Sequence, residues 1–198
     1  MRLVVDWDGT VTVRDSLVQV LHEFGDPALL SELEPRVGVD LTLHEEIALE
    51  FQTITTPLDV VVDWVVQHVE VRPGLRQLAA YEPMVISAGF HELIAPVLAR
   101  EGIELEVLAN RLDARHDGWV VRFRDETACA VCGEPCKRGS LAGEPYIYVG
   151  DGYSDRCAAL AAEKVFARDG LARYLDEQAL LYEPFDDLHD VARQFDGN

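Results

Sequence analysis

Two aspartates near the start of the chain, Asp6 and Asp8, have the type and spacing of a metal site that handles phosphate. They follow an apolar run, residues 3–5, that predicts a short buried strand, and Gly9 then lets the chain leave the sheet sharply. In an open parallel sheet, ligands bind beyond the carboxyl ends of the strands, so both carboxylates are expected in the cleft. They would repel each other there unless Mg²⁺ bound to them and to a substrate phosphate. The simpler interpretation is a turn that uses Asp and Gly for turn chemistry alone.

A second polar segment, Ser87 and Ala88, follows the next predicted strand at residues 83–86. A helix is expected over residues 91–100, and the free backbone N–H groups at the start of a helix attract anions. We therefore predict that Ser87 and Ala88 form part of an anion site. The alternative is that Ser87 is an ordinary N-cap of that helix.

Four short stretches together resemble the haloacid-dehalogenase superfamily of phosphohydrolases. Asp-Trp-Asp-Gly-Thr at residues 6–10 is similar to the first motif of that superfamily, and Ser87 is similar to the second. Lys137, followed by Arg-Gly, is similar to the third-motif lysine, and Gly-Asp-Gly-Tyr-Ser-Asp at residues 150–155 resembles the fourth motif. The four stretches occur in the order of the superfamily, which weighs strongly against a simple turn at residues 6–10.

The resemblance implies a role for each of these residues. Asp6 would be the nucleophile that becomes a transient aspartyl phosphate, and Asp8 would be the general acid and base. A carboxylate is a weak nucleophile, so it must be aimed in line at phosphorus while the surrounding charge is neutralised. Ser87, Ala88 and Lys137 would bind the phosphoryl oxygens, and a compact ammonium suits that role as a point charge.

The same resemblance implies Mg²⁺ as the cofactor, bound by Asp6, Asp151 and the backbone carbonyl of Asp8. The glycines around Asp151 would let the backbone approach the metal site closely. Asp155 would lie either on the metal through water or against the lysine. Three residues are expected to support this site: Thr10, Gly152 and Asp155.

These residues require an α/β fold in which parallel strands end at one edge of a sheet. We predict a Rossmann-like parallel sheet core and a small helical cap inserted after the first strand. The core would comprise residues 1–13 and 73–198, and the cap would comprise residues 14–72, where apolar residues recur at helical spacing. Strands are expected at residues 3–5, 83–86, 103–108, 146–149 and 165–167, a hairpin at 110–123, and helices at 75–81, 91–100, 171–178 and 187–195.

The cap and the segments around Asn110 and Lys137 resemble the phosphoserine-phosphatase-like branch of the superfamily. Phosphoserine phosphatases hold the serine of the substrate with a cap glutamate and a cap arginine. Here Asp15 stands near the place of the glutamate, and Glu46 and Glu50 stand where the arginine is expected. We therefore expect Asp15 and Glu46 to contact the substrate, and we do not expect phosphoserine to be preferred.

A diffuse similarity around Asp15 and at residues 165–167 and 185–187 points to the 2-hydroxy-3-keto-5-methylthiopentenyl-1-phosphate phosphatases of methionine salvage. An unpaired substrate carboxylate beside cap acids in a closed site is unfavourable, so we expect a neutral or hydroxylated leaving group. Two alternatives stay open: a phosphoserine phosphatase, and a phosphometabolite-binding protein of the same fold without catalysis.

A cysteine cluster precedes the lysine of the third motif. Cys129, Cys132 and Cys136 lie close together in the sequence, and Cys157 is the fourth thiol. A CxxC pair with a further cysteine resembles a zinc ligand set, so a structural Zn²⁺ at the first three is one interpretation. A regulatory disulfide and reduced packing thiols are the others, and reduced thiols are favoured because no second CxxC pair follows.

The composition limits the partners of this 198-residue chain. Seventeen Lys and Arg against 36 Asp and Glu give a formal net charge of −19, which would repel nucleic acid and anionic membranes. No apolar run approaches the roughly 20 residues that cross a bilayer, and the first strand starts without a signal-peptide pattern. We expect a soluble, cytoplasmic protein that acts on a small phosphate ester, with no nucleic-acid or membrane partner. The oligomeric state is not readable from the sequence.

Overall fold

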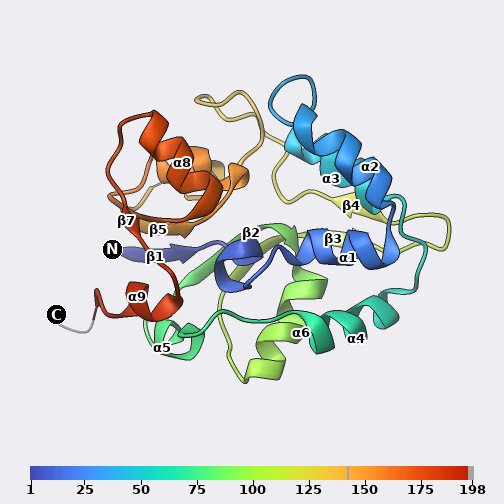
Figure 1. The fold of residues 1–198 in the computed structure, drawn as a ribbon, viewed down its shortest axis with the longest axis horizontal. Helices are drawn as coiled ribbons and strands as arrows, with labels where there is room; N and C mark the ends of the chain where they lie inside the picture. The colour runs from blue at the N-terminus through green and yellow to red at the C-terminus, as the bar shows by residue number, and fades with distance from the viewer. Residues whose placement is uncertain (142, 196–198) are drawn as a thin grey trace.

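The computed structural model describes residues 1–141 and 143–195, and in them one twisted sheet lies between layers of helices (Figure 1). Its strands are β1 (Arg2–Val5), β2 (Met84–Phe90), β3 (Val107–Asp113), β4 (Val120–Arg122), β5 (Tyr146–Gly150), β6 (Lys164–Ala167) and β7 (Glu183–Pro184). The order across the sheet is β4-β3-β2-β1-β5-β6-β7, in which β4 pairs antiparallel with β3 and the other neighbours are parallel. The segment after β1 therefore lies between the segments that follow β2 and β5, as the predicted α/β fold requires.

Helices cover both faces of this sheet and also form the insert that follows β1. Within the described residues, every helix is too short or too polar to span a lipid bilayer. The helices are α1 (Ser16–Phe24), α2 (Pro27–Leu33), α3 (Leu43–Phe51), α4 (Leu58–His68), α5 (Leu75–Ala79), α6 (His91–Glu101), α7 (Arg156–Ala159), α8 (Asp169–Glu177) and α9 (Leu188–Ala192), with short 3₁₀ turns at Glu34–Arg36, Lys137–Leu141 and Tyr153–Asp155.

The alternation of side chains along the central strands produces two separate cores. Successive residues of a strand point to opposite faces, so Val5 and Val85 join one cluster while Val4 and Met84 join the other. The first cluster contains the buried faces of α5, α6 and α9, and the second contains those of α7 and α8. Both faces are covered, which explains why β1 and β5 are apolar at almost every position.

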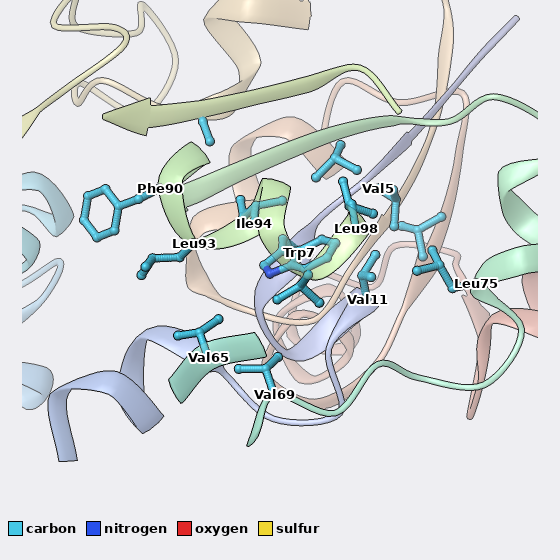
Figure 2. Packing of buried hydrophobic residues seen from close by; sticks show 14 of the residues in the cluster. Val5, Trp7, Val11, Val65, Val69, Leu75, Phe90, Leu93, Ile94 and Leu98 are labelled. Atoms are coloured by element: carbon cyan, nitrogen blue, oxygen red, sulfur yellow. The ribbon is translucent and has the colours of Figure 1, made fainter. Parts of the chain in front are cut away.

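Trp7, which separates the two first-motif aspartates, is buried in the first core. Figure 2 shows its ring near Val11, Ile94 and Leu98, and only 1% of its surface is exposed. Burying a large apolar side chain stabilises by about 1.5–3 kcal/mol, so this ring fixes the loop after β1 to the core. Its neighbours on either side line the cleft instead.

The insert between β1 and β2 is tied together where it leaves and rejoins the core. Val13 donates its backbone N–H to the carbonyl of Glu70 at 2.9 Å, and Arg72 donates to the carbonyl of Val11 at 2.8 Å. Residues of α1, α2 and α3 line a cavity together with Asp6 and Asp8. The helix α4 packs beside α6 (Figure 1). The domain boundaries at residues 13/14 and 72/73 stay a prediction.

Three sequence expectations about elements differ from the structure. The third strand begins at Val107 and not at residue 103, because β3 starts where it pairs with Val85 of β2. The second strand continues through Ser87 to Phe90 before α6 begins, so no turn follows residue 86. The short strand β7 at the edge of the sheet was not expected, because two residues carry no periodic signal.

Candidate active site

The cleft lies beyond the carboxyl ends of β1, β2 and β5, where two adjoining cavities share residues such as Ala88 and Tyr153. The larger cavity, about 440 Å³, is lined by Asp6, Asp8 and Asp151 together with apolar and acidic residues of the insert. The smaller, about 310 Å³, is lined by the predicted phosphate-binding residues: Ser87, Ala88 and Lys137. The fold thus brings the four sequence motifs to one place.

Lys137 joins the first motif to the fourth. Its ammonium donates to Asp6 and, at 2.7 Å, to Oδ1 of Asp155, and its side chain is only 4% exposed. The hydroxyl of Tyr148 also donates to Asp155 Oδ1 at 2.7 Å. The other oxygen of Asp155 accepts the backbone N–H groups of Asp151 and Gly152, each at 2.9 Å. Of the two sequence alternatives for Asp155, the contacts seen are those of a residue that holds the lysine.

Negative charge exceeds positive charge in this cluster. Burial raises the pKa of Asp6 well above its ordinary value, and repulsion by Asp155 adds to this effect although Lys137 opposes it. Burial and the charge of Asp155 also raise the pKa of Asp151 to about 6. Burial acts to lower the pKa of Lys137, but its two acidic partners outweigh it and hold that pKa above the ordinary value. The single ammonium of Lys137 therefore does not balance the negative charge of the carboxylates, and a second cation bound here would reduce their repulsion.

The residues present fit Mg²⁺ as that cation. Carboxylate oxygens of Asp6, Asp151 and Asp155 lie within 4.8 Å of one another, and oxygen ligands of this kind suit Mg²⁺. Because Asp155 is occupied by its hydrogen bonds, Asp6 and Asp151 are the two that would hold the ion. Thr10 donates to Asp151 Oδ1 at 2.7 Å. A Cβ at Gly9 would lie only 2.4 Å from Asp151 Oδ2, so this position needs glycine to let the carboxylate pack against the loop.

Asp8 is held apart from these carboxylates by two serines. Its Oδ1 accepts hydrogen bonds from the hydroxyl and the backbone N–H of Ser16, and its Oδ2 accepts from Ser87 Oγ at 3.1 Å. Burial raises the pKa of Asp8, and the hydrogen bonds from Ser16 and Ser87 oppose that shift. A carboxyl with a raised pKa can carry a proton near neutral pH, as a general acid must. Sequence reasoning missed Ser16, whose only local signal is its place at the start of α1.

Ser87 lies inside β2 and is not an N-cap. The helix α6 begins at His91, as predicted, with Phe90 as its N-cap residue, so the interpretation of Ser87 as an N-cap is wrong. Ser87 Oγ accepts the backbone N–H of Gly89 at 2.8 Å, and Asn110 donates to the carbonyl of Ala88 at 2.7 Å. The strand and Asn110 therefore fix this segment, and Ser87 faces the cleft from a rigid element.

Arg72 holds the backbone of the first-motif loop in place, a role that no sequence pattern indicated. This buried guanidinium donates to the backbone carbonyls of Gly9 at 2.8 Å and Thr10 at 2.9 Å. It also donates to the carbonyls of Thr12, Val13 and Asp186. The backbone carbonyls of Gly9 and Thr10 thus point toward Arg72. The side chains of Asp6 and Asp8 line the cleft.

The insert contributes acids to the larger cavity, as expected, but two of them are buried. Asp15 is exposed and caps α1 by accepting the N–H of Val18 at 2.9 Å. Glu46 and Glu50 on α3 are only 9% and 5% exposed. Burial, with the charge of Glu34, raises the pKa of Glu46 to about 7, and burial, with the charge of Glu46, raises the pKa of Glu50 to about 8. Their charge therefore depends on pH in the neutral range.

Glu50→Gln is expected to stabilise the protein at alkaline pH and much less at acid pH. A carboxyl with a raised folded-state pKa binds more protons folded than unfolded, so stability falls as pH rises from 4.5 to about 8. The amide removes that loss and should raise the free energy of unfolding by on the order of 1 kcal/mol at about pH 8.5. Urea unfolding at about pH 5 and 8.5 measures it, with exposed Glu23→Gln as the matched control. An equal effect at both pH values would contradict the prediction.

Two arginines near Lys137 were also missed by sequence reasoning. Arg124 and Arg156 line the smaller cavity, and among the described residues the buried Nε atom of each has no hydrogen-bond partner. The guanidinium of Arg156 lies over the rings of Tyr153 and Tyr174, 4.7 Å from each centroid. The phosphate side of the cleft is thus more positive than the net charge of the chain suggests.

This geometry agrees with the family to which the sequence belongs. A profile of the haloacid dehalogenase-like hydrolase family matches residues 3–160, so the chain is a member of that family and an enzyme of hydrolase type. The family resemblance and the α/β fold predicted from the sequence are both confirmed.

Relatives named 2-hydroxy-3-keto-5-methylthiopentenyl-1-phosphate phosphatase align along nearly the whole chain. The protein of Bacillus cereus (strain ATCC 10987 / NRS 248) is 26% identical over 209 residues, which cover 98% of this chain and 95% of that protein. The protein of Bacillus thuringiensis (strain Al Hakam) is 27% identical over 206 residues, which cover 96% of this chain and 94% of that protein.

Solved phosphoserine phosphatases share the fold. The enzyme from T. onnurineus superposes with a TM-score of 0.68 at 19% identity, covering 99% of this chain and 94% of that one. A phosphoserine phosphatase described as a phospho-aspartyl intermediate analogue superposes with a TM-score of 0.72 at 17% identity, covering 97% of both chains.

Proposed function

We propose that this hydrolase is a Mg²⁺-dependent phosphatase that cleaves a small phosphate monoester through a phosphorylated Asp6. The observation that carries the proposal is the meeting of Asp6, Lys137 and Asp151 at the carboxyl ends of β1 and β5, with Asp8 held separately by Ser16. The names of the aligned relatives also support a phosphatase.

The residues divide the reaction into two steps. An oxygen of Asp6 attacks phosphorus as the bond from phosphorus to the leaving oxygen breaks, and Asp8 gives its proton to that oxygen. Water then attacks phosphorus, Asp8 accepts a proton from it, and the bond to Asp6 breaks to release phosphate. Lys137 and Ser87 hold the phosphoryl oxygens during both steps. Bound Mg²⁺ would neutralise the phosphoryl oxygens and align them with Asp6.

For the substrate, we propose a metabolite whose leaving group is neutral or hydroxylated. The cavity beside Asp8 is lined by Asp15, Glu46 and Glu50. The two glutamates disfavour a substrate carboxylate more strongly as pH rises, because they lose their protons in the neutral range. The aligned relatives are named for 2-hydroxy-3-keto-5-methylthiopentenyl-1-phosphate, a name that contains a hydroxyl and a keto group and no carboxylate, which is consistent with such a leaving group. Nucleic acid and membranes are not proposed as partners because of the negative charge of the chain.

Phosphate release from a metabolite panel, with and without Mg²⁺, tests this function. We expect kcat/KM for keto-sugar or enol phosphates to exceed that for phosphoserine by roughly ten- to a hundredfold, with phosphoethanolamine as the amine-bearing comparison that lacks a carboxylate. A clear preference for phosphoserine would favour the alternative of a phosphoserine phosphatase. No Mg²⁺-dependent release from any ester would favour a non-catalytic binding protein.

A further inference from the structure

Four cysteine side chains meet next to the active site although the sequence separates one of them from the rest. Cys129, Cys132 and Cys136 lie in the loop before Lys137, and Cys157 lies on α7. All four Sγ atoms lie within 4.8 Å of one another. The sequence indicated at most three ligands, and the fold supplies the fourth.

We propose that Cys129, Cys132, Cys136 and Cys157 bind one structural Zn²⁺. Tetrahedral zinc with Zn–S bonds of about 2.3 Å places its sulfurs about 3.8 Å apart. The Sγ atoms of Cys129 and Cys157 are 3.7 Å apart, whereas a disulfide would bring them to about 2.05 Å. Four thiolates around one tetrahedral centre form the ligand set of a structural zinc, whereas a polynuclear iron–sulfur cluster would also need room for sulfide and several irons.

The loop has the backbone contacts that such a site uses. Val131 directs its backbone N–H to Cys129 Sγ at 3.4 Å, which places a donor beside a sulfur that would carry negative charge. The backbone N–H of Gly133 donates to the carbonyl of Cys129 at 2.8 Å and closes the turn, and Gly133 has a φ of +81°. The CxxC residues of this turn can therefore bind one ion from the same side.

The position of the cluster indicates what the zinc would do. Cys136 immediately precedes Lys137, and Cys157 follows Asp155 closely in the sequence, so the ion would connect the two segments whose side chains form the buried ion pair. The loop has little apolar packing of its own, since Val131 is 57% exposed. Zinc would thus position Lys137 against Asp155 without touching substrate.

Metal analysis of the full-length protein, expressed with zinc in the medium and dialysed without chelator, tests the site. We expect about one zinc per chain in the wild type and a loss of most of it in Cys157→Ser and in Cys132→Ser. Val131→Ser, in the same loop, should keep its zinc and serves as the matched control. Wild-type zinc well below one per chain, or undiminished zinc in Cys157→Ser, would overturn the proposal.

Cobalt binding keeps the test decisive if the variants fail to fold. The wild type, stripped of zinc under reducing conditions and titrated with Co²⁺, should show the strong visible and thiolate charge-transfer absorption of a tetrahedral sulfur site. Its absence would refute the site. These readouts do not depend on phosphatase activity, so their failure is distinct from failure of the proposed function.

The proposed effect on Lys137 rests on that function and has its own readout. In the zinc-depleted enzyme we expect a lower kcat that added Mg²⁺ does not restore and added Zn²⁺ does, together with a lower Tm. Full activity and an unchanged Tm after complete zinc removal would show that the ion does not position Lys137.

Discussion

The Asp6→Asn variant is expected to lose turnover by at least about 1,000-fold while it keeps its fold, because an amide cannot attack phosphorus to form the acyl phosphate. The fold should persist because the buried negative charge of Asp6 destabilises the folded protein when no ligand is bound. Its pKa is raised by burial and by the charge of Asp155, so the loss of its charge partly offsets the loss of its contact with Lys137.

Steady-state phosphate release and thermal unfolding, measured on the same preparation, separate these two effects. Asp63→Asn makes the same chemical change on the exposed surface of α4 and should match the wild type in both assays. A variant at Asp6 with more than about a tenth of the wild-type kcat would refute the nucleophile assignment. An unfolded variant would instead show that its contact with Lys137 outweighs the repulsion.

Lys137→Met is expected to produce the largest loss of stability, about 3–5 kcal/mol, together with a near-complete loss of activity. Methionine fills a similar volume but leaves Asp6 and Asp155 buried without their shared cation. Breaking a buried ion pair by removing one partner is costly because the remaining charge stays out of water. The activity falls because no ammonium remains to bind the phosphoryl oxygens.

Urea unfolding measures this loss, and Lys164→Met provides the matched control. Lys164 forms a partly exposed ion pair with Glu183 at 3.8 Å, which should be worth only about 0–1 kcal/mol. Added Mg²⁺ should recover part of the stability of Lys137→Met, since a ligand of the folded state stabilises it. A loss no larger than that of the control would mean that the ion pair does not stabilise the site as the buried geometry implies.

The sequence alone determined which residues approach one another at the candidate site. Asp6 and Asp151 each follow an apolar strand, Ser87 follows the apolar run at residues 83–86, and the strands of a parallel sheet end at the same edge. Local patterns of this kind are readable because the strand period and the turn residues are properties of short segments. The predicted cleft, the α/β fold and the family resemblance all rest on such segments.

Only the tertiary structure decided how these residues are held and charged. Ser16, Arg72 and Tyr148 contact Asp8, the first-motif loop and Asp155, yet none has a local pattern that marks it. The pKa of Glu50 depends on its burial against other acids, which a helical repeat does not reveal. Cys157 lies beside the other three cysteines only in the folded chain, because its segment is distant from theirs in the sequence. Hydrogen bonds, burial and metal geometry are set by contacts between distant segments, and the chain brings those segments together only when the whole sheet has formed.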